Sequence, residues 1–264
     1  MSDSRPKTAI VFSAGGMYGA WEVGVWKALE PVVRPDIVVG ASIGAVNGYA
    51  VAGGCTAEEL RRQWLALEGL ARLELQMPWG LRGIVKSDPV ERLIRELYGR
   101  YPARVEFGVV VTDTLRLRPV LVRTPHVSWQ HLAASTAMIG IYRQHRIGGR
   151  IYSDGGLLHA LPVWAAVEMG ATRIVAINCL AKMPSAAVRG VVKSLRRIAR
   201  WRAPATPDHV EVIRLDPSED LGSARSAFVW SRANAERWIA LGERDGAVLR
   251  DRITEAAPRA SAPD

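Results

Sequence analysis

The chain has 264 residues, of which 48% are hydrophobic and 23% charged, and its formal net charge is +9 at pH 7. This composition is typical of a globular protein and argues against a disordered chain. Two cysteines, neither in a cluster of metal-ligating residues, argue against a disulfide framework and a structural zinc site. The positive charge indicates an anionic partner such as nucleic acid, a membrane surface or an acidic substrate.

Short apolar runs alternate with helical patterns along most of the chain. In order, the patterns predict a strand at 8–12, a helix at 20–33, a strand at 36–39, helices at 44–53, 57–70 and 89–98, strands at 105–112 and 119–122, a helix at 128–138, a hairpin at 146–152, a helix at 162–169, a strand at 173–178, a helix at 185–202, a strand at 209–215 and a largely helical segment at 223–252. This alternation predicts a mostly parallel sheet with helices on both faces.

We expect a single domain over residues 1–255, followed by a disordered tail at 256–264 that is rich in Ala and Pro. No run approaches the ~20 apolar residues of a transmembrane helix. The first residues do not resemble a signal peptide, because their apolar stretch is very short. The sequence therefore predicts a cytoplasmic protein, with peripheral membrane contact as an option.

Residues 40–44 read Gly-Ala-Ser-Ile-Gly, between a predicted strand and a predicted helix. Gly-x-Ser-x-Gly in this context is typical of a nucleophile elbow, a sharp turn that exposes the serine hydroxyl. The flanking residues must be small because the chain packs closely on either side, and Gly40 and Gly44 meet this need. The pattern predicts Ser42 as a nucleophile, and the alternative is a glycine-rich turn in which the serine is an N-cap.

The glycine loop at 13–19 follows the first predicted strand and opens a helix. Its backbone N–H groups could stabilise an oxyanion or bind a phosphate. It contains neither a Walker pattern nor a complete Gly-x-Gly-x-x-Gly, so a nucleotide-binding module stays only an alternative. Because adjacent parallel strands end at the same edge of a sheet, the loop and the elbow could face one crevice.

A nucleophilic serine needs a base. None of the five histidines lies in a motif, although His159 or His209 could complete a Ser-His-Asp triad. Asp154 is the better candidate, because it begins an Asp-Gly-Gly sequence after a predicted hairpin, where small neighbours permit unusual backbone angles. The alternative for Asp154 is an ordinary Asx turn.

Together, three motifs resemble those of the patatin-like phospholipase family. They are Ser13-Ala14-Gly15-Gly16-Met17-Tyr18-Gly19, Gly40-Ala41-Ser42-Ile43-Gly44 and Asp154-Gly155-Gly156, with further similarity at 20–25, 133–138, 161–163 and 168–171. The resemblance extends from Lys7 to Asn178, about two-thirds of the chain.

The resemblance implies a three-layer α/β/α fold with a Ser-Asp dyad and no catalytic histidine. Ser42 would be the nucleophile and Asp154 the general base. The oxyanion hole would consist of the backbone N–H groups of Gly15, Gly16 and Met17. The supporting positions would be Tyr18, Gly19, Gly40, Gly44, Gly155 and Gly156. The reaction would be hydrolysis of a carboxylic ester in a lipid through an acyl-serine intermediate, with no metal and no organic cofactor.

Three places depart from the family pattern. Ala14 replaces a usual glycine, Tyr18 replaces a usual Arg or Lys, and Arg143-Gln144 replaces a usual pair of prolines. A cation at position 18 would stabilise an oxyanion or bind a substrate phosphate, whereas tyrosine carries no charge. The alternative function is therefore a catalytically weak or silent lipid-binding protein on the same fold.

The segment 185–202 holds six Lys or Arg residues and no acid, so the rest of the chain sums to 9 − 6 = +3. Its apolar residues recur at helical spacing, which is typical of a helix that lies on an anionic membrane with Trp201 at the interface. Alternatively, the apolar stripe packs on the sheet and the arginines are solvated. The charge does not predict a nucleic-acid partner, because no nucleic-acid motif accompanies it.

Overall fold

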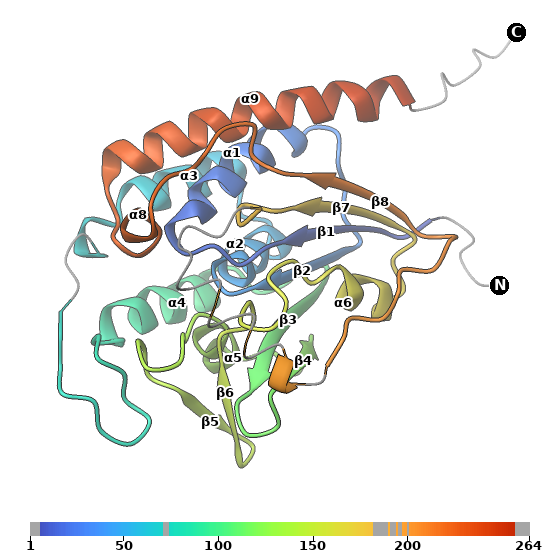
Figure 1. The fold of residues 1–264 in the computed structure, drawn as a ribbon. Helices are drawn as coiled ribbons and strands as arrows, with labels where there is room; N and C mark the ends of the chain where they lie inside the picture. Colours follow the sequence, from blue (N-terminus) through green and yellow to red (C-terminus); the bar gives the residue numbers. More distant parts are fainter. Residues whose placement is uncertain are drawn as a thin grey trace, which may run out of the picture.

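The computed structural model describes residues 6–70, 74–181, 190, 194, 197–199 and 201–256 (Figure 1). Most of the predicted helix at 185–202, and the predicted tail beyond residue 256, lie outside the described residues. Trp201 is described, and it packs edge-on against Trp164 with ring centroids 5.5 Å apart. For Trp201, this contact favours the alternative in which the segment packs on the protein over the one in which this side chain lies at a membrane interface.

A mixed eight-stranded sheet forms the centre of the molecule. Its strands are β1 (Thr8–Phe12), β2 (Ile37–Ala41), β3 (Glu106–Asp113), β4 (Arg118–Arg123), β5 (His145–Ile147), β6 (Arg150–Ser153), β7 (Arg173–Ile177) and β8 (Glu211–Leu215). The order is β5-β6-β3-β2-β1-β7-β8, with β4 paired to β3. Strands β3, β2, β1, β7 and β8 run parallel, while β4, β6 and the β5–β6 hairpin pair antiparallel.

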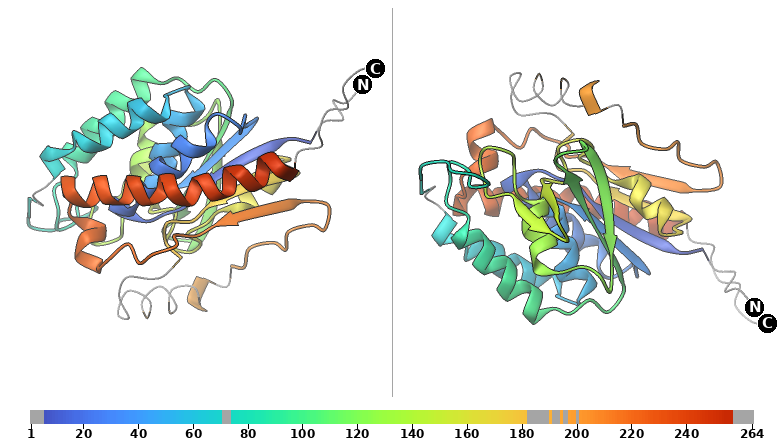
Figure 2. Two further views of the ribbon diagram at one scale, coloured as in Figure 1. Left: turned by 90° about the horizontal axis from the view of Figure 1, so that it is seen from above. Right: turned by 90° about the horizontal axis from the view of Figure 1, so that it is seen from below.

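Helices cover both faces of this sheet, as the alternating pattern predicts (Figures 1 and 2). They are α1 (Gly19–Leu29), α2 (Ile43–Ala52), α3 (Ala57–Leu65), α4 (Asp88–Arg100), α5 (Trp129–Ser135), α6 (Val163–Glu168), α8 (Ala224–Phe228) and α9 (Arg232–Ala256), with short 3-10 helices η1 (Gly16–Tyr18) and η2 (Glu68–Leu70). Among the described residues, no helix is long and apolar enough to cross a lipid bilayer.

Alternate residues of the central strands face two separate apolar layers. In β1, Ile10 and Phe12 pack with residues of α1, α2 and α9, whereas Ala9 and Val11 pack with residues of α6. This period of two, with both faces buried, explains why the parallel strands appear in the sequence as continuous apolar runs. The arrangement is an α/β/α sandwich.

The helix predicted at 57–70 ends at Leu65 instead, and it begins with a capping box formed by Thr56 and Glu59. The indole N–H of Trp230 donates to the Trp64 carbonyl at 2.9 Å, and Arg232 donates to the Leu65 carbonyl at 3.4 Å. Carbonyls at a helix end need such partners. Side chains that are distant in sequence thus terminate α3, which the local pattern could not indicate.

Helices α1 and α9 pack closely because glycines lie at their contact. A Cβ atom on Gly24 would lie 2.0 Å from the Ile239 carbonyl oxygen, and one on Gly242 would lie 2.1 Å from the Trp21 carbonyl oxygen. The Trp21 indole also donates to Asp245 across this contact at 2.8 Å. In Figure 2, α9 lies along α1 on the outside of the sheet.

The close contact at Gly24 and the open space around Gly99 predict opposite effects of an alanine replacement on stability. Gly24→Ala should lower the free energy of unfolding by roughly 2 kcal/mol, because backbone atoms of α9 would have to move. Gly99→Ala in α4 should leave it unchanged or raise it by up to about 1 kcal/mol, since alanine favours a helix and nothing lies within 4 Å of the added carbon. Urea denaturation of both variants measures the difference, and equal effects would contradict this account of the packing.

Candidate active site

Ser42 lies at the sharp turn between β2, which ends at Ala41, and α2, which begins at Ile43. Its φ is 55° and its ψ is −129°, a conformation that residues other than glycine rarely adopt. A Cβ atom on Gly40 would lie 2.2 Å from the Gly44 carbonyl oxygen, and one on Gly44 would lie 2.3 Å from the Ser13 carbonyl oxygen. The turn is thus strained and closely packed, which are the two properties that the sequence motif predicts for it.

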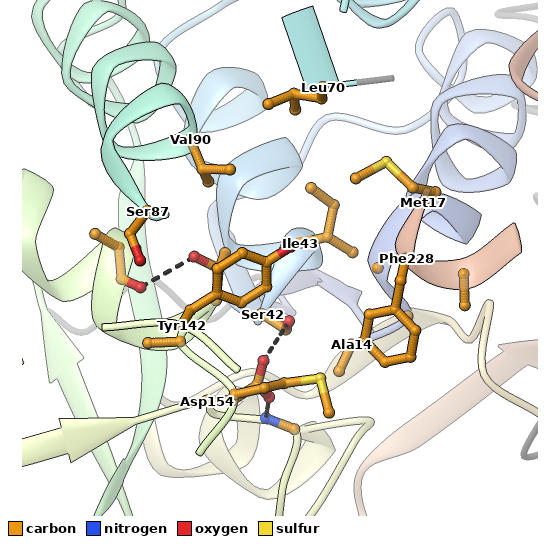
Figure 3. A pocket seen from close by; sticks show the side chains of 18 of the residues that line it. Ala14, Met17, Ser42, Ile43, Leu70, Ser87, Val90, Tyr142, Asp154 and Phe228 are labelled. Carbon is orange, nitrogen blue, oxygen red and sulfur yellow. Dashed lines mark hydrogen bonds between the residues drawn. The ribbon is translucent and has the colours of Figure 1, made fainter. Parts of the chain in front are cut away.

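The hydroxyl of Ser42 donates a hydrogen bond of 2.7 Å to Oδ2 of Asp154 (Figure 3). The topology of β3 explains this meeting across 112 residues of chain. Strand β2 pairs with residues 106–110 of β3, and β6 pairs with Thr112 and Asp113. Because β4 occupies the other edge of β3 at those two residues, β2 and β6 share one edge and their ends meet.

Asp154 is buried, and its environment suits a proton acceptor. Burial raises the pKa of its carboxyl to about 6, although hydrogen bonds from Ser42 and Gly156 act in the opposite direction. The Gly156 N–H donates to Oδ1 at 2.7 Å, which leaves Oδ2 directed at Ser42. Thr112 Oγ1 donates to the Asp154 carbonyl at 2.8 Å, and the Asp154 N–H donates to the Ala137 carbonyl at 2.9 Å. The backbone of Asp154 is therefore fixed on both sides.

Ser135 forms hydrogen bonds both to Ser42 and to the turn that carries Asp154, although the sequence did not single it out. Its hydroxyl accepts a hydrogen bond from the Ser42 N–H at 2.8 Å and donates to the Val110 carbonyl at 2.7 Å. Its carbonyl accepts from the Gly155 N–H at 3.1 Å. Only the similarity of segment 133–138 to the family pointed at this region.

The glycine loop meets the same pocket as Ser42 and Asp154. Gly15, Gly16 and Met17 all line it, and the Gly15 N–H has no hydrogen-bond partner among the described residues. Gly16 has a φ of 58° and lies so close to the Ala227 carbonyl that a Cβ atom would be 2.2 Å from its oxygen. This position therefore requires glycine for both its backbone angle and its space.

A buried carboxyl group holds the start of this loop. Glu22 accepts hydrogen bonds from the Ser13 N–H at 2.9 Å and from the Asn47 side chain at 2.9 Å. Burial raises the pKa of Glu22 to about 8, while these hydrogen bonds lower it. Asn47 also accepts from the Trp64 indole at 2.9 Å, which connects the loop to α2 and α3. Nothing in the local sequence pattern indicates the burial of Glu22, so its role becomes visible only in the fold.

The departures at positions 14 and 18 have different structural consequences. A Cβ atom on Gly156 would lie 2.2 Å from the Ala14 methyl group, so the glycine at 156 makes room for the alanine. The Tyr18 hydroxyl donates to the Ser223 carbonyl at 2.8 Å, and its ring packs edge-on against Trp238. Tyr18 is therefore turned toward α8 and α9 and does not line the pocket.

The third departure, Arg143-Gln144, lies in a segment that borders the same pocket. Arg143 lines it and lies 3.6 Å from the Glu91 carboxylate. The Gln144 side chain donates to the Ala137 carbonyl at 3.0 Å, and this same carbonyl accepts the hydrogen bond from the Asp154 N–H.

The histidines considered for a triad lie elsewhere. His159 bonds to the Leu161 carbonyl at 2.9 Å, and neither His159 nor His209 lines the pocket that holds Ser42. His145 does line it, 3.6 Å from Glu91, and burial together with the Arg143 charge lowers the pKa of His145 to about 4. The group hydrogen-bonded to the Ser42 hydroxyl is a carboxyl group.

The pocket around Ser42 has a volume of about 200 Å³ and is mostly apolar. Figure 3 shows Met17, Ile43, Leu70, Val90, Tyr142 and Phe228 around it, with Ser42 and Asp154 at its base. A hydroxyl bonded to a buried carboxylate can act as an activated nucleophile, and apolar walls can accommodate a hydrocarbon group. Within the described part of the chain, no group of three or more His, Cys, Asp or Glu side chains could hold a metal ion.

Comparisons with known proteins identify the fold and the family of this chain. The structure of VipD from Legionella pneumophila superimposes with a TM-score of 0.55 at 14% identity, covering 94% of this chain and 67% of that one, which shows a shared fold. The family model described as patatin-like phospholipase matches residues 10–167, which is more than half of the sequence. The chain therefore belongs to the patatin-like phospholipase family.

Relatives identified by sequence are distant and longer. An uncharacterized NTE family protein of Mycobacterium tuberculosis is 27% identical over 182 residues, covering 66% of this chain and 49% of that protein. Patatin-like phospholipase domain-containing protein 6 of Homo sapiens is 26% identical over 180 residues, covering 64% of this chain and 13% of that protein. The chain spans about half the length of the mycobacterial relative.

Proposed function

We propose that this protein is a serine hydrolase that cleaves carboxylic ester bonds in lipids, with Ser42 as nucleophile and Asp154 as general base. The observation that carries the proposal is the 2.7 Å hydrogen bond from a strained elbow serine to a buried carboxyl group in an apolar pocket. Membership of the patatin-like phospholipase family supports lipid hydrolysis as the class of reaction.

In this mechanism, the Asp154 carboxylate accepts the hydroxyl proton as Ser42 Oγ attacks the ester carbonyl carbon. The tetrahedral intermediate collapses as the protonated Asp154 returns this proton to the departing alcohol, which leaves an acyl-Ser42. A water molecule then gives its proton to Asp154 and attacks the acyl group. Release of the fatty acid restores the serine hydroxyl and the carboxylate.

The negative charge on the carbonyl oxygen would be stabilised by the backbone N–H groups of Gly15, Gly16 and Met17. Two observations support this assignment: the three residues line the pocket beside Ser42, and the Gly15 N–H has no partner among the described residues. The N-terminus of α2, which begins at Ile43, adds a favourable dipole. Tyr18 is uncharged and bonded to Ser223. We therefore propose that residue 18 supplies no positive charge to this site.

Reaction with a fluorophosphonate tests the proposal directly, because the reagent modifies only an activated serine. Intact-mass analysis should show one adduct on the wild-type protein, mapped to Ser42 by peptide sequencing, and none on Ser42→Ala. A wild-type protein that is folded yet unlabelled would instead favour the catalytically silent lipid-binding alternative.

Membrane contact through residues 185–202 also stays a prediction, since most of that segment lies outside the described residues.

The pKa of Asp154 predicts how the rate depends on pH. The base must be deprotonated, and burial raises its pKa to about 6, so half of the molecules are inactive near that pH. We expect kcat/KM for a soluble p-nitrophenyl ester to reach a plateau above pH 7 and to fall about tenfold per pH unit well below pH 6. A stopped assay over this range measures it, and a rate independent of pH between 5 and 8 would contradict the assignment.

A further inference from the structure

The segment from Glu74 to Lys86, here called the apolar loop, exposes an unusual set of side chains. Met77 is 86% exposed, Trp79 is 82% exposed and Leu75 is 72% exposed, and Leu81 and Ile84 are exposed as well. Met77 and Trp79 are the two most exposed large hydrophobic residues in the described part of the chain. Figure 1 shows the segment between η2 and α4 extending away from the body of the molecule. Contiguous exposed apolar groups of this kind mark interaction surfaces.

The apolar loop is held in place by backbone hydrogen bonds. Within the loop, the Gln76 N–H donates to the Ile84 carbonyl at 2.8 Å. Toward the body, Ile84 and Val85 donate to the carbonyls of Gly140 and Ile141, at 3.1 and 2.9 Å. A Cβ atom on Gly83 would lie 2.2 Å from the Ile141 carbonyl oxygen, so the chains are in close contact there. The exposed side chains therefore extend from an anchored base.

This base is also part of the wall of the Ser42 pocket. The segment that anchors the loop contributes Met138, Tyr142 and Arg143 to the pocket lining. Leu70, just before the loop, and Val90, just after it, also line the pocket and appear on one side of it in Figure 3. A surface that binds the loop would thus lie beside the wall of the Ser42 pocket.

The charges of the loop favour an anionic surface. The loop holds one acid, Glu74, against two bases, Arg82 and Lys86, which are both exposed. Lys86 pairs with Glu74 at 2.9 Å, but Arg82 has no ion-pair partner among the described residues. Tryptophan and aliphatic side chains beside arginine and lysine are the groups that bind the interface of an anionic bilayer.

We infer that the apolar loop inserts Met77 and Trp79 into the surface of an anionic lipid bilayer and thereby places the Ser42 pocket against it. The inference rests on the proposed function in one respect, because hydrolysis of lipids is the reason for placing the pocket against a bilayer. Insertion of the loop itself needs no catalysis. The surface differs from the basic segment at 185–202, which lies elsewhere in the chain.

Vesicle flotation tests this inference in a Ser42→Ala background, which prevents hydrolysis of the lipid. The probes are phosphatidylcholine vesicles with and without phosphatidylglycerol. The double variant Met77→Ser/Trp79→Ser should partition at least about tenfold more weakly than its parent onto the anionic vesicles. Val248→Ser, which removes a 56% exposed apolar side chain from α9, serves as the matched control and should bind like the parent. Arg82→Gln should reduce the preference for phosphatidylglycerol.

Unchanged vesicle binding by the double variant, or no binding by its parent, would overturn the inference. A dimer that dissociates in the double variant, with no vesicle binding, would instead assign the loop to self-association. With Ser42 intact, the double variant should hydrolyse a soluble ester at the parental rate. Vesicle binding that depends on the loop in a protein with no esterase activity would refute the proposed function and leave this inference standing.

Discussion

Replacing Ser42 with alanine should lower kcat/KM for p-nitrophenyl butyrate by about 10⁴-fold or more, because the reaction then has no nucleophile to form the acyl intermediate. The replacement removes one oxygen atom and its hydrogen bond to Asp154, while the Ser42 N–H can still donate to Ser135. The fold should therefore persist. Initial rates, corrected for the uncatalysed reaction, and a thermal melt of the same sample measure both properties.

A second serine provides the control for this measurement. Ser231 directly precedes α9 and does not line the Ser42 pocket. Ser231→Ala should keep the wild-type rate. If Ser42→Ala retains full activity while remaining folded, the elbow assignment is wrong and another nucleophile must be sought.

Replacing Asp154 with asparagine should lower kcat/KM by about 10³-fold while preserving the shape of the site. The asparagine oxygen can still accept from the Gly156 N–H, but its amide would present N–H groups to Ser42 in place of the carboxylate oxygen. The serine proton then has no acceptor. Rates measured at pH 8, where wild-type Asp154 is ionised, give the largest contrast. Wild-type activity in Asp154→Asn would assign the role of base to a different group.

The same variant should be at least as stable as the wild type at pH 8. Burial raises the pKa of Asp154 from 3.8 to about 6, so the folded state binds more protons than the unfolded state between these values. The contribution of Asp154 to stability therefore falls as pH rises through this window. The stability gained by Asp154→Asn should be full above pH 6 and vanish toward pH 4. Urea denaturation at several pH values measures this, and a variant that loses stability most at high pH would contradict it.

The sequence predicts the central strands β1, β2, β3 and β7 well because they are buried on both faces. The β1 run Thr8–Phe12 and the centre of β3 are short, β-branched and apolar, which leaves little ambiguity about their state. Helix ends are harder to predict. Helix α3 ends where Trp230 and Arg232 satisfy its last carbonyl groups, and these partners lie more than 160 residues along the chain.

The residues of the candidate site also differ in whether the sequence indicates them. Ser42 and Asp154 are visible in the sequence because the turns that carry them need glycine neighbours at fixed spacing. Ser135 and Glu22 are not visible, because their roles depend on contacts across the fold: Ser135 bonds to a residue 93 positions away. The orientation of Tyr18 depends similarly on Ser223, which lies 205 positions further along the chain.

The meeting of β2 and β6 on one edge of β3 also determines which changes in chain length the site can tolerate. Residues added at the exposed Gly148-Gly149 turn would lengthen the hairpin and leave Asp154 in place. Deleting one residue from Arg150–Ser153 would exchange the two faces of β6 and turn the carboxyl group away from Ser42. The distance between the Ser42 and Asp154 side chains thus depends on the number of residues in a short strand, so the outer end of the hairpin can vary in length without moving either side chain.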